Sequence, residues 1–214
     1  MEAKLVLSLF SSYLIGSIPF TQILAKWVKG IDLRQVGSHN VGGRNLTRQL
    51  GLLWGILGSA LDIGKGAAAL WAAELIGVPA PLRLVNGMAV VAGHNWPLWL
   101  RFHGGKGLAA ALGAITWVVF PEGFWGLVVG LLVLIPTHNI FYMSIAGLST
   151  MLSVAFLLQR PVEIILFICG TWAVIFLASL PNVLATLTTS GALAAYFREP
   201  DGIYRKEAEQ RKKN

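Results

Sequence analysis

The sequence predicts an all-α integral membrane protein with about seven transmembrane helices. Hydrophobic residues make up 55% of the 214 residues and charged residues only 13%, and the mean hydropathy of +0.66 is well above that of soluble domains. Most apolar runs approach the ~20 residues that a helix needs to cross a bilayer. The net charge of +7 lies almost wholly in short segments between and after these runs. This distribution favours membrane orientation and anionic partners over general nucleic-acid binding.

The apolar runs predict where the spans lie. They cover residues 5–27, 52–77, 84–100, 107–120, 123–136, 140–158 and 162–180. Lys4 before the first run is also typical of a signal peptide, but the run continues without a small-x-small cleavage pattern, which favours a retained span. Pro121, Glu122 and Gly123 predict a turn between the fourth and fifth runs, which are both short. One long broken helix over these two runs is the alternative.

The basic residues predict the orientation. They gather in residues 26–50, 101–106 and 198–213, whereas the alternate connections hold only Arg83 and Arg160. With seven spans all three basic segments fall on one side, which the positive-inside rule makes cytoplasmic. With six spans the basic tail would fall on the wrong side. We therefore expect a multi-pass protein of the cytoplasmic membrane, with its N-terminus outside and its C-terminus in the cytoplasm.

The chain has no room for a separate soluble domain. We expect residues 1–197 to form one polytopic membrane domain, ending in a weakly apolar helix near the interface at 183–197, and residues 198–214 to form a charged cytoplasmic tail. The single cysteine, Cys169, lies in the middle of a predicted span, which excludes a disulfide framework and a thiol-metal cluster. The four histidines are too scattered to predict a metal site, so we expect neither a metal nor a cofactor.

The stretch GSHNVGGRNLTRQLG, residues 37–51, predicts an anion site at the mouth of the second span. Glycine lets backbone N–H groups turn toward one point, serine and asparagine add side-chain donors, and arginine adds a fork that fits phosphate. The alternative is a flexible, positively charged loop that only fixes orientation. The density of asparagine favours a site, because orientation needs only charge. The candidate residues are Ser38, Asn40, Gly42, Asn45 and Arg48.

A second glycine-rich stretch places Lys106 within His-Gly-Gly-Lys-Gly at the start of a span. A helix N-terminus with a lysine and free amides binds phosphate well. The stretch is not a Walker A loop, because Leu100 and Leu108 stand where a glycine and a Ser or Thr are required, so NTP hydrolysis is not supported. A glycine-lined turn with one snorkelling lysine is the alternative. The candidate residues are His94, Gly104, Gly105, Lys106 and Gly107.

Asp62 and Lys65 lie within an apolar span. Ionisable groups at that depth are costly and usually face a partner or a wet cavity. Their i,i+3 spacing lets them pair on one helix face, so a structural ion pair is favoured over direct catalysis. The chain has no Gly-x-Ser-x-Gly elbow, and a serine-hydrolase mechanism therefore has no support.

Together these segments resemble the PlsY-type bacterial glycerol-3-phosphate acyltransferases, over about residues 10 to 150. YLIGSIPF at 13–20 is similar to that family's opening, and LDIGKG at 61–66 to its second-span pattern. The family's Gly-Ser-x-Asn-x-Gly-x-x-Asn-x-x-Arg pattern fits residues 37–48. Its Gly-His and Gly-Gly-Lys-Gly motif fits residues 93–109. Ser144, in YMSIAG, stands where the family has a serine that opens the sixth span.

The resemblance implies a seven-span fold with cytoplasmic motifs and transfer of a fatty acyl group from acyl phosphate to the 1-hydroxyl of glycerol 3-phosphate, which gives lysophosphatidic acid. Both substrates carry phosphate, so clustered cations and amides must offset their repulsion. Acyl phosphate is already activated, so holding hydroxyl and carbonyl together does much of the work without an enzyme nucleophile. We expect catalytic roles for Ser38, Arg48, His94 and Lys106. We expect substrate-binding roles for Asn40, Gly42, Asn45, Gly104, Gly105, Gly107, Ser144 and Asn182.

The sequence departs from the family pattern in several places. Ser179 stands where a histidine of the last motif would be, and after Asn182 no arginine follows until Arg198. Arg44 and Ala110 each replace a threonine. A member with an altered acceptor is therefore one alternative. Another is a membrane channel or transporter for a phosphorylated solute, since glycine-rich breaks and intramembrane charges occur there too. Against transport, the chain shows no inverted repeat, and its polar groups gather on one membrane face.

Overall fold

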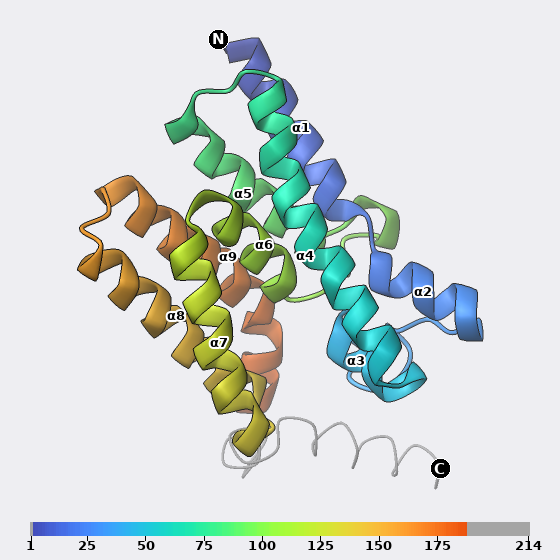
Figure 1. The fold of residues 1–214 in the computed structure, drawn as a ribbon. Coiled ribbons are helices and arrows are strands. Elements are labelled where there is room, and N and C mark those ends of the chain that lie inside the picture. Colours follow the sequence, from blue (N-terminus) through green and yellow to red (C-terminus); the bar gives the residue numbers. More distant parts are fainter. Residues whose placement is uncertain (1, 188–214) are drawn as a thin grey trace, which may run out of the picture.

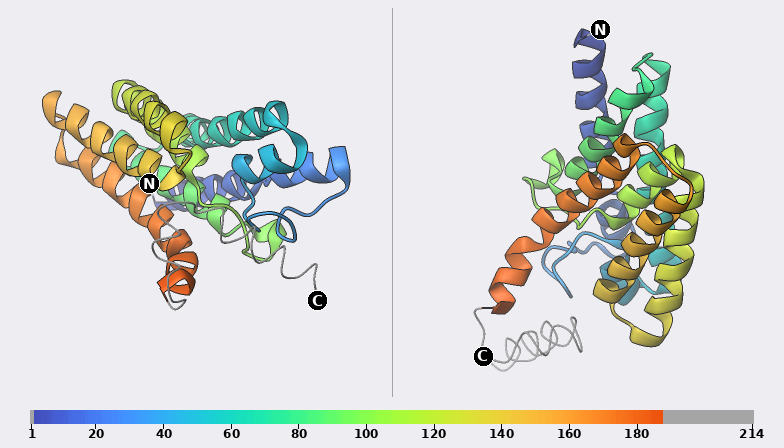
Figure 2. Two further views of the ribbon diagram at one scale, coloured as in Figure 1. Left: turned by 90° about the horizontal axis from the view of Figure 1, so that it is seen from below. Right: turned by 90° about the vertical axis from the view of Figure 1, so that its left-hand side faces the viewer.

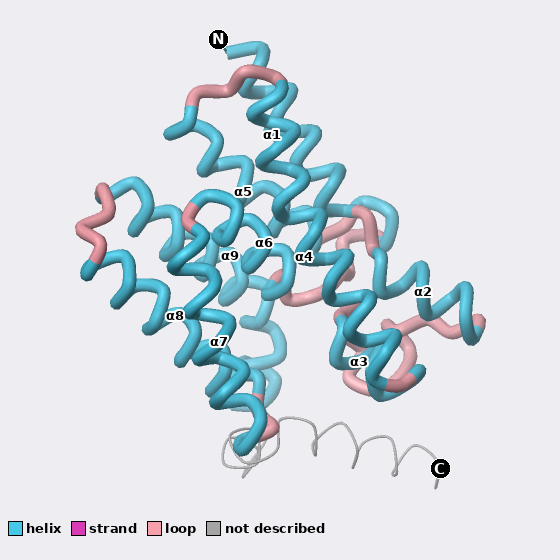
Figure 3. Tube along the Cα trace, in the orientation of Figure 1, coloured by secondary structure: helices cyan, strands magenta, loops and turns pink. Residues whose placement is uncertain are grey.

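The computed structural model describes residues 2–187, and the regular structure in this range is entirely helical (Figures 1 and 3). The predicted charged tail, 198–214, and most of the predicted interfacial helix, 183–197, lie outside the described residues. The elements are α1 (Glu2–Ser17), α2 (Phe20–Lys29), α3 (Gly43–Leu50), α4 (Leu52–Leu75), α5 (Ala80–Asn95), the short 3₁₀ helix η1 (Leu98–Leu100), α6 (Leu108–Val118), α7 (Phe120–Thr137), α8 (Ile140–Leu157) and α9 (Val162–Leu187). The all-α prediction is confirmed for these residues.

Four helical segments of the described part are long and apolar enough to cross a membrane. They are Glu2–Lys29, Phe120–Thr137, Ile140–Leu157 and Val162–Leu180. Helix α4 has 24 residues but carries charged groups, and the apolar helix α6 has only 11. The chain is thus a multi-pass membrane protein, whereas the number seven and the side of each terminus stay predictions.

Two predicted boundaries differ in the structure. The first predicted span is broken at Ile18-Pro19, where the ring of proline cannot continue the hydrogen bonds of a helix. The predicted turn at Pro121–Gly123 is wrong, because these residues lie in the first turn of α7, and the break is the single residue Val119. Proline is well suited to a first helical turn, where its missing N–H has no partner to lose. The last candidate span, Val162–Leu180, has the predicted bounds, but its helix α9 continues to Leu187.

Glycines let the helices approach one another closely. A Cβ on Gly16 of α1 would collide with the carbonyl of Val90 in α5, and one on Gly66 of α4 with the carbonyl of Ala110 in α6. Small residues at such crossings are how helices pack where lipid removes the hydrophobic driving force. Helices α7 and α8 form an antiparallel pair, and α9 lies against α5 and α8 (Figure 2). This packing gives a rigid support for the loops between the helices.

The two ends of the molecule are formed by different elements. The N-terminus of α1 and the α4–α5 connection lie at one end, and α3 and the α7–α8 corner lie at the other (Figure 1). Helix α2 turns away from α1 and runs across its direction. A fully buried carboxylate, Glu122, lies at the start of α7 and pairs with Arg160 over 2.6 Å. This pairing encloses the side chain of Glu122.

Candidate active site

The first glycine-rich loop, residues 30–42, is organised by one buried amide. Asn45 on α3 has no exposed surface, and its Nδ2 donates to the carbonyls of Leu33, Val36 and Asn40 over 3.1, 3.0 and 3.1 Å. Its Oδ1 accepts from the backbone N–H of Ser38 over 3.3 Å. These bonds engage both hydrogens of the amide and one lone pair of its oxygen. Asn45 thus shapes the loop around Ser38, and its direct contact with substrate stays a prediction.

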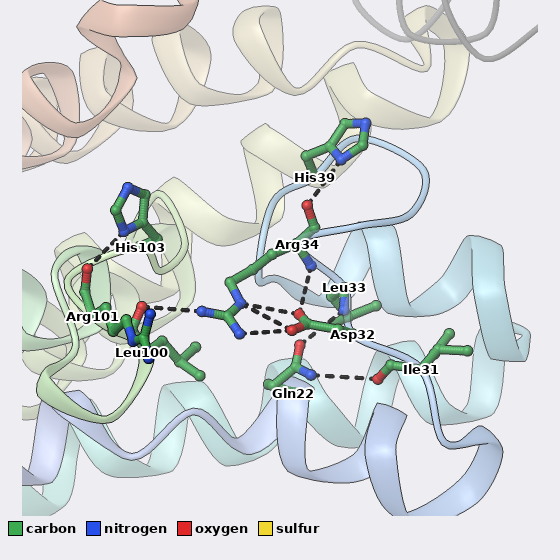
Figure 4. A network of polar contacts seen from close by, with 9 residues as sticks. All are labelled: Gln22, Ile31, Asp32, Leu33, Arg34, His39, Leu100, Arg101 and His103. Atoms are coloured by element: carbon green, nitrogen blue, oxygen red, sulfur yellow. Dashed lines mark hydrogen bonds and ion pairs between the residues drawn. The ribbon is translucent and has the colours of Figure 1, made fainter. Parts of the chain in front are cut away.

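A second polar network holds the start of this loop (Figure 4). Gln22 on α2 accepts from the N–H of Leu33 over 2.9 Å and donates to the carbonyl of Ile31 over 3.3 Å. Asp32 accepts from Arg34 in a forked arrangement, with a shortest distance of 2.6 Å, and this bond lowers the pKa of the Asp32 carboxyl. The loop is thus fixed from α2 and α3 together.

The second glycine-rich loop, residues 101–107, lies against the end of α5. The N–H groups of Gly104 and Gly105 donate to the carbonyls of Asn95 and His94, over 3.1 and 3.2 Å. A Cβ on Gly105 would collide with the Nε2 edge of the His94 ring, so only glycine fits there. The expectation of free amides therefore fails at these two glycines, which hold the loop close to α5. Gly107, with φ +81°, ends the loop and begins α6.

The two loops are in direct contact. The N–H of Val41 donates to the carbonyl of Gly104 over 3.4 Å, and a Cβ on Gly105 would stand 2.5 Å from the carbonyl oxygen of Val41. Arg34 makes a second connection, donating to the carbonyl of Leu100 over 3.2 Å (Figure 4). Segments that lie about 60 residues apart in sequence therefore form one surface.

Three cations surround this junction. Burial lowers the pKa of Lys106, and the positive charge of Arg44 lowers it further. The pKa of Arg48 is lowered by burial and by the same Arg44 charge, so Arg48 and Lys106 each lie within electrostatic reach of Arg44. Arg44 itself donates to the carbonyl of His138 at the α7–α8 corner, over 2.5 Å. Within residues 2–187, the ammonium of Lys106 has no hydrogen-bond or ion-pair partner, so it is well suited to bind an anion.

Two helix N-termini open at the same junction. Helices α3 and α6 begin directly after Gly42 and Gly107, and neither has a side-chain cap on its first turn. The first N–H groups of a helix have no partner inside the helix, and the helix dipole favours an anion at that point. The free amides that the sequence predicts are thus those of the two helix starts, next to Arg44 and Lys106.

The intramembrane charges form a buried support behind the second loop. Asp62 and Lys65, which the spacing predicts to pair, lie 2.9 Å apart and are almost completely buried. Nδ1 of His94 lies 3.6 Å from the same carboxylate oxygen of Asp62, and the opposite edge of the ring faces Gly105. Lys65 also donates to the carbonyl of Ile18 at the α1–α2 break, over 2.8 Å. Asp62 is thus placed to orient His94 and not to meet substrate.

The remaining predicted residues lie on the first loop, on α8 and on α9. Ser38 and Asn40 are half-buried on the first loop. Ser144 is half-buried in the first turns of α8, near the corner that Arg44 contacts. Asn182 lies in α9, in a stretch whose side chains are not described. A cavity of about 310 Å³ beside Lys4 lies at the other end of the molecule, away from both glycine-rich loops.

Sequence reasoning missed the residues that tie the loops together. Gln22 is a polar residue within an apolar run, and that exception was the available signal. Asp32 and Arg34 precede the glycine motif and resemble ordinary surface charges in sequence. Asn95, next to His94, is 3% exposed and donates to the carbonyl of Val174 in α9 over 3.3 Å. The bonds from Arg34 to Leu100 and from Asn95 to Val174 join residues far apart in the chain, which no local pattern shows.

The chain matches a known protein family. The family model described as glycerol-3-phosphate acyltransferase matches residues 6–194. A curated relative from Dehalococcoides mccartyi, glycerol-3-phosphate acyltransferase 2, is 42% identical over 118 residues, which are 55% of this chain and 56% of the relative. The glycerol-3-phosphate acyltransferase of Desulforamulus reducens is 46% identical over 110 residues, 51% of this chain and 55% of the relative. The chain thus spans about half the length of the curated relatives it matches.

Two solved structures are similar over most of the fold. The crystal structure of PlsY, an integral membrane glycerol 3-phosphate acyltransferase, in its glycerol 3-phosphate form has a TM-score of 0.76 and 32% sequence identity. That match covers 90% of this chain and 98% of the other. The lysophosphatidic acid form has a TM-score of 0.74 and 30% identity, covering 86% of this chain and 92% of the other.

Proposed function

We propose that this chain, which belongs to the glycerol-3-phosphate acyltransferase family, transfers a fatty acyl group from acyl phosphate to glycerol 3-phosphate. The product of this transfer is lysophosphatidic acid. The observation that carries the proposal is the junction of the two glycine-rich loops, where the partly buried ammonium of Lys106 lies close to Arg44. The positive charges of Lys106 and Arg44 repel each other, and within the described residues no carboxylate pairs with Lys106. A bound anion offsets this repulsion.

The geometry supports binding of two phosphate groups. Helices α3 and α6 each offer an uncapped N-terminus, and the bond between Val41 and Gly104 holds the two helix starts side by side. We infer that one substrate phosphate binds near each start. Arg48 and Lys106 then offset the repulsion between the two phosphates, which otherwise opposes bringing the substrates together. Ser38 and Asn40 add donors from the first loop.

The transfer itself requires only correct placement of two substrates. The hydroxyl oxygen of the acceptor attacks the acyl carbonyl carbon, the bond from that carbon to the phosphate oxygen breaks, and the hydroxyl proton ends on the released inorganic phosphate. Fixing two reactants in this geometry supplies much of the rate enhancement. Donors at the loop junction stabilise the negative charge that develops on the carbonyl oxygen. We assign His94 to holding the second loop through Gly105, supported by Asp62.

The position of the junction fits a lipid-like donor. It lies at the end of the helices that carries most of the basic residues of the described part, including Arg44, Arg48 and Lys106. We propose that this end faces the cytoplasm, with seven spans and an outside N-terminus. The acyl chain of the donor then stays in the inner leaflet of the cytoplasmic membrane while its phosphate reaches the loops.

A transfer assay tests the proposal. Purified protein is incubated with palmitoyl phosphate and labelled glycerol 3-phosphate, and lysophosphatidic acid is separated by chromatography, with Lys106→Gln as the matched impaired control. We expect product with wild type, formed at a strongly reduced rate by Lys106→Gln. No product, together with uptake of labelled glycerol 3-phosphate into proteoliposomes, would establish a transporter instead. Product with other phosphorylated alcohols, but not with glycerol 3-phosphate, would establish an altered acceptor.

A further inference from the structure

Helix α2 has an outer face that no other part of the described structure covers. The chain breaks at Pro19, and α2 then runs outward across the direction of α1 (Figures 1 and 2). Its inner face is buried against α3 and α4. Its outer face is exposed and mixes large apolar residues with lysines: Ile23 (49% exposed), Trp27 (77%), Val28 (40%), Lys26 and Lys29.

The apolar part of this face continues onto the start of α4. The rings of Trp27 and Trp54 pack edge to face, with centroids 6.3 Å apart. Beside them Leu52 and Leu53 are 67% and 75% exposed. The Trp27–Trp54 contact thus joins the exposed apolar residues of α2 to those at the start of α4, and an exposed apolar patch of this kind marks an interaction site. Because the patch continues along a helix of the membrane-embedded bundle, its natural cover is lipid.

The charges on α2 indicate which lipid. Lys26 and Lys29 lie in the last turn and are exposed, and the helix contains no acidic residue. Lys29 donates to the carbonyl of Gln49 over 3.1 Å, which holds its side chain at the edge of the patch. A helix with tryptophan on its apolar side and lysines at its border is typical of the interface between lipid tails and anionic headgroups.

We propose that the outer face of α2, together with Leu52 and Leu53, is a binding surface for anionic phospholipid. In this arrangement α2 lies in the plane of the interface instead of extending the first span. Trp27 enters the boundary of the acyl chains, and Lys26 and Lys29 bind headgroup phosphates. The neighbouring lipids are thereby enriched in anionic headgroups over the bulk composition. The surface lies outside the catalytic junction, so the inference does not depend on the proposed reaction.

The same helix connects this surface to the first glycine-rich loop. Gln22, on the inner face and 3% exposed, holds the backbone of Ile31 and Leu33 (Figure 4). The proposed lipid surface and the first glycine-rich loop are thus joined through one helix, α2.

Fluorescence quenching by brominated lipids tests the binding surface without any assay of catalysis. The protein is reconstituted in phosphatidylcholine vesicles in which a fixed minor fraction is brominated, either as phosphatidylglycerol or as phosphatidylcholine. The difference between wild type and Trp27→Phe isolates the signal of Trp27 from the other tryptophans. We expect brominated phosphatidylglycerol to quench that signal at least twofold more than brominated phosphatidylcholine at equal fraction.

Charge variants complete the test. The double variant Lys26→Gln, Lys29→Gln is expected to lose the preference for phosphatidylglycerol while Trp27 stays quenched by both lipids. Lys4→Gln, a change at the opposite end of the molecule, is the matched control and should keep the preference. Equal quenching by both lipids in the wild type would overturn the anionic preference. Absence of quenching by either lipid would show that α2 lies in water and would overturn the whole inference.

Discussion

The guanidinium of Arg34 donates to the carbonyl of Leu100 over 3.2 Å while Asp32 holds it from the other side over 2.6 Å. This bond joins the loop before α3 to the loop before α6. Together with the bond between Val41 and Gly104, it sets the separation of the two helix starts at which we place the substrate phosphates. Arg34 and Asp32 therefore position the two helix starts without contacting the substrate phosphates that we place there.

Replacing Arg34 should impair transfer through this positioning. Arg34→Lys keeps the charge but cannot bond Asp32 and Leu100 together, because an ammonium lacks the planar fork. We expect kcat/KM to fall by an amount equivalent to about 1.5–3 kcal/mol, the range for hydrogen bonds to charged groups. Arg101→Lys, a change of an exposed arginine in the same region, is the control and should be close to wild type. Steady-state kinetics with both substrates varied measures the effect, and unchanged kinetics of Arg34→Lys would remove the positioning role.

Arg48 and Lys106 should serve phosphate binding directly. Loss of either charge, in Arg48→Ala or Lys106→Ala, should cost ~2–4 kcal/mol of transition-state stabilisation, as for a lost oxyanion donor. Arg48→Lys should also be impaired, since a point charge does not replace a bidentate fork. Arg83→Ala, at the far end of the molecule, is the control. If both alanine variants kept near wild-type kcat/KM with intact folding, the phosphate site at the loop junction would be wrong.

The alkaline side of the pH profile should report on Lys106. Phosphate binds the protonated ammonium, so affinity is full below the pKa of Lys106 in the free protein and is lost as the pH rises through it. Burial, and then the charge of Arg44, lower this pKa, so the loss begins at a lower pH than for an ordinary lysine. Arg44→Gln removes the second cause and should move the loss to higher pH. In Lys106→Arg the group stays charged, and the alkaline loss should disappear from kcat/KM.

Parts of this structure follow from local patterns, and other parts do not. The apolar runs predict the helices because burial in lipid and helical hydrogen bonding act on each run separately. Pro121 predicts a boundary correctly but not its kind, because proline suits both a turn and the first turn of a helix. The amides of Gly104 and Gly105 are used by α5, whose position no local pattern gives. The enclosure of Glu122 by Arg160 is likewise a consequence of tertiary packing.

The orientation of the chain can be tested with single cysteines in a Cys169→Ala background. The structure selects the positions: Gly43 packs against Ser59 and leaves no room for a side chain, whereas Gln35 on the first loop and Ala80 at the start of α5 are exposed. We expect an impermeant thiol reagent added to intact cells to label Ala80→Cys and not Gln35→Cys. Both should be labelled after the cells are opened. The reverse pattern in intact cells would contradict an outside N-terminus and a cytoplasmic site.

The central claim is direct acyl transfer between two substrates held at the loop junction. Within residues 2–187 the single thiol, Cys169, lies in the first half of α9, and Ser38 is the serine on the first glycine-rich loop. Because acyl phosphate is already activated, no covalent relay is needed, and Ser38 should act as a hydrogen-bond donor to phosphate. Ser38→Ala should therefore lower the rate or the affinity without abolishing transfer.

A single-turnover experiment tests this claim most directly. Enzyme in excess over labelled palmitoyl phosphate is mixed with glycerol 3-phosphate, quenched in acid at short times, and assayed for lysophosphatidic acid, inorganic phosphate and protein-bound acyl group. We expect lysophosphatidic acid and phosphate to appear together, in equal amounts, with no acyl group on the protein. Release of phosphate before lysophosphatidic acid, with the label trapped on Ser38, would contradict it.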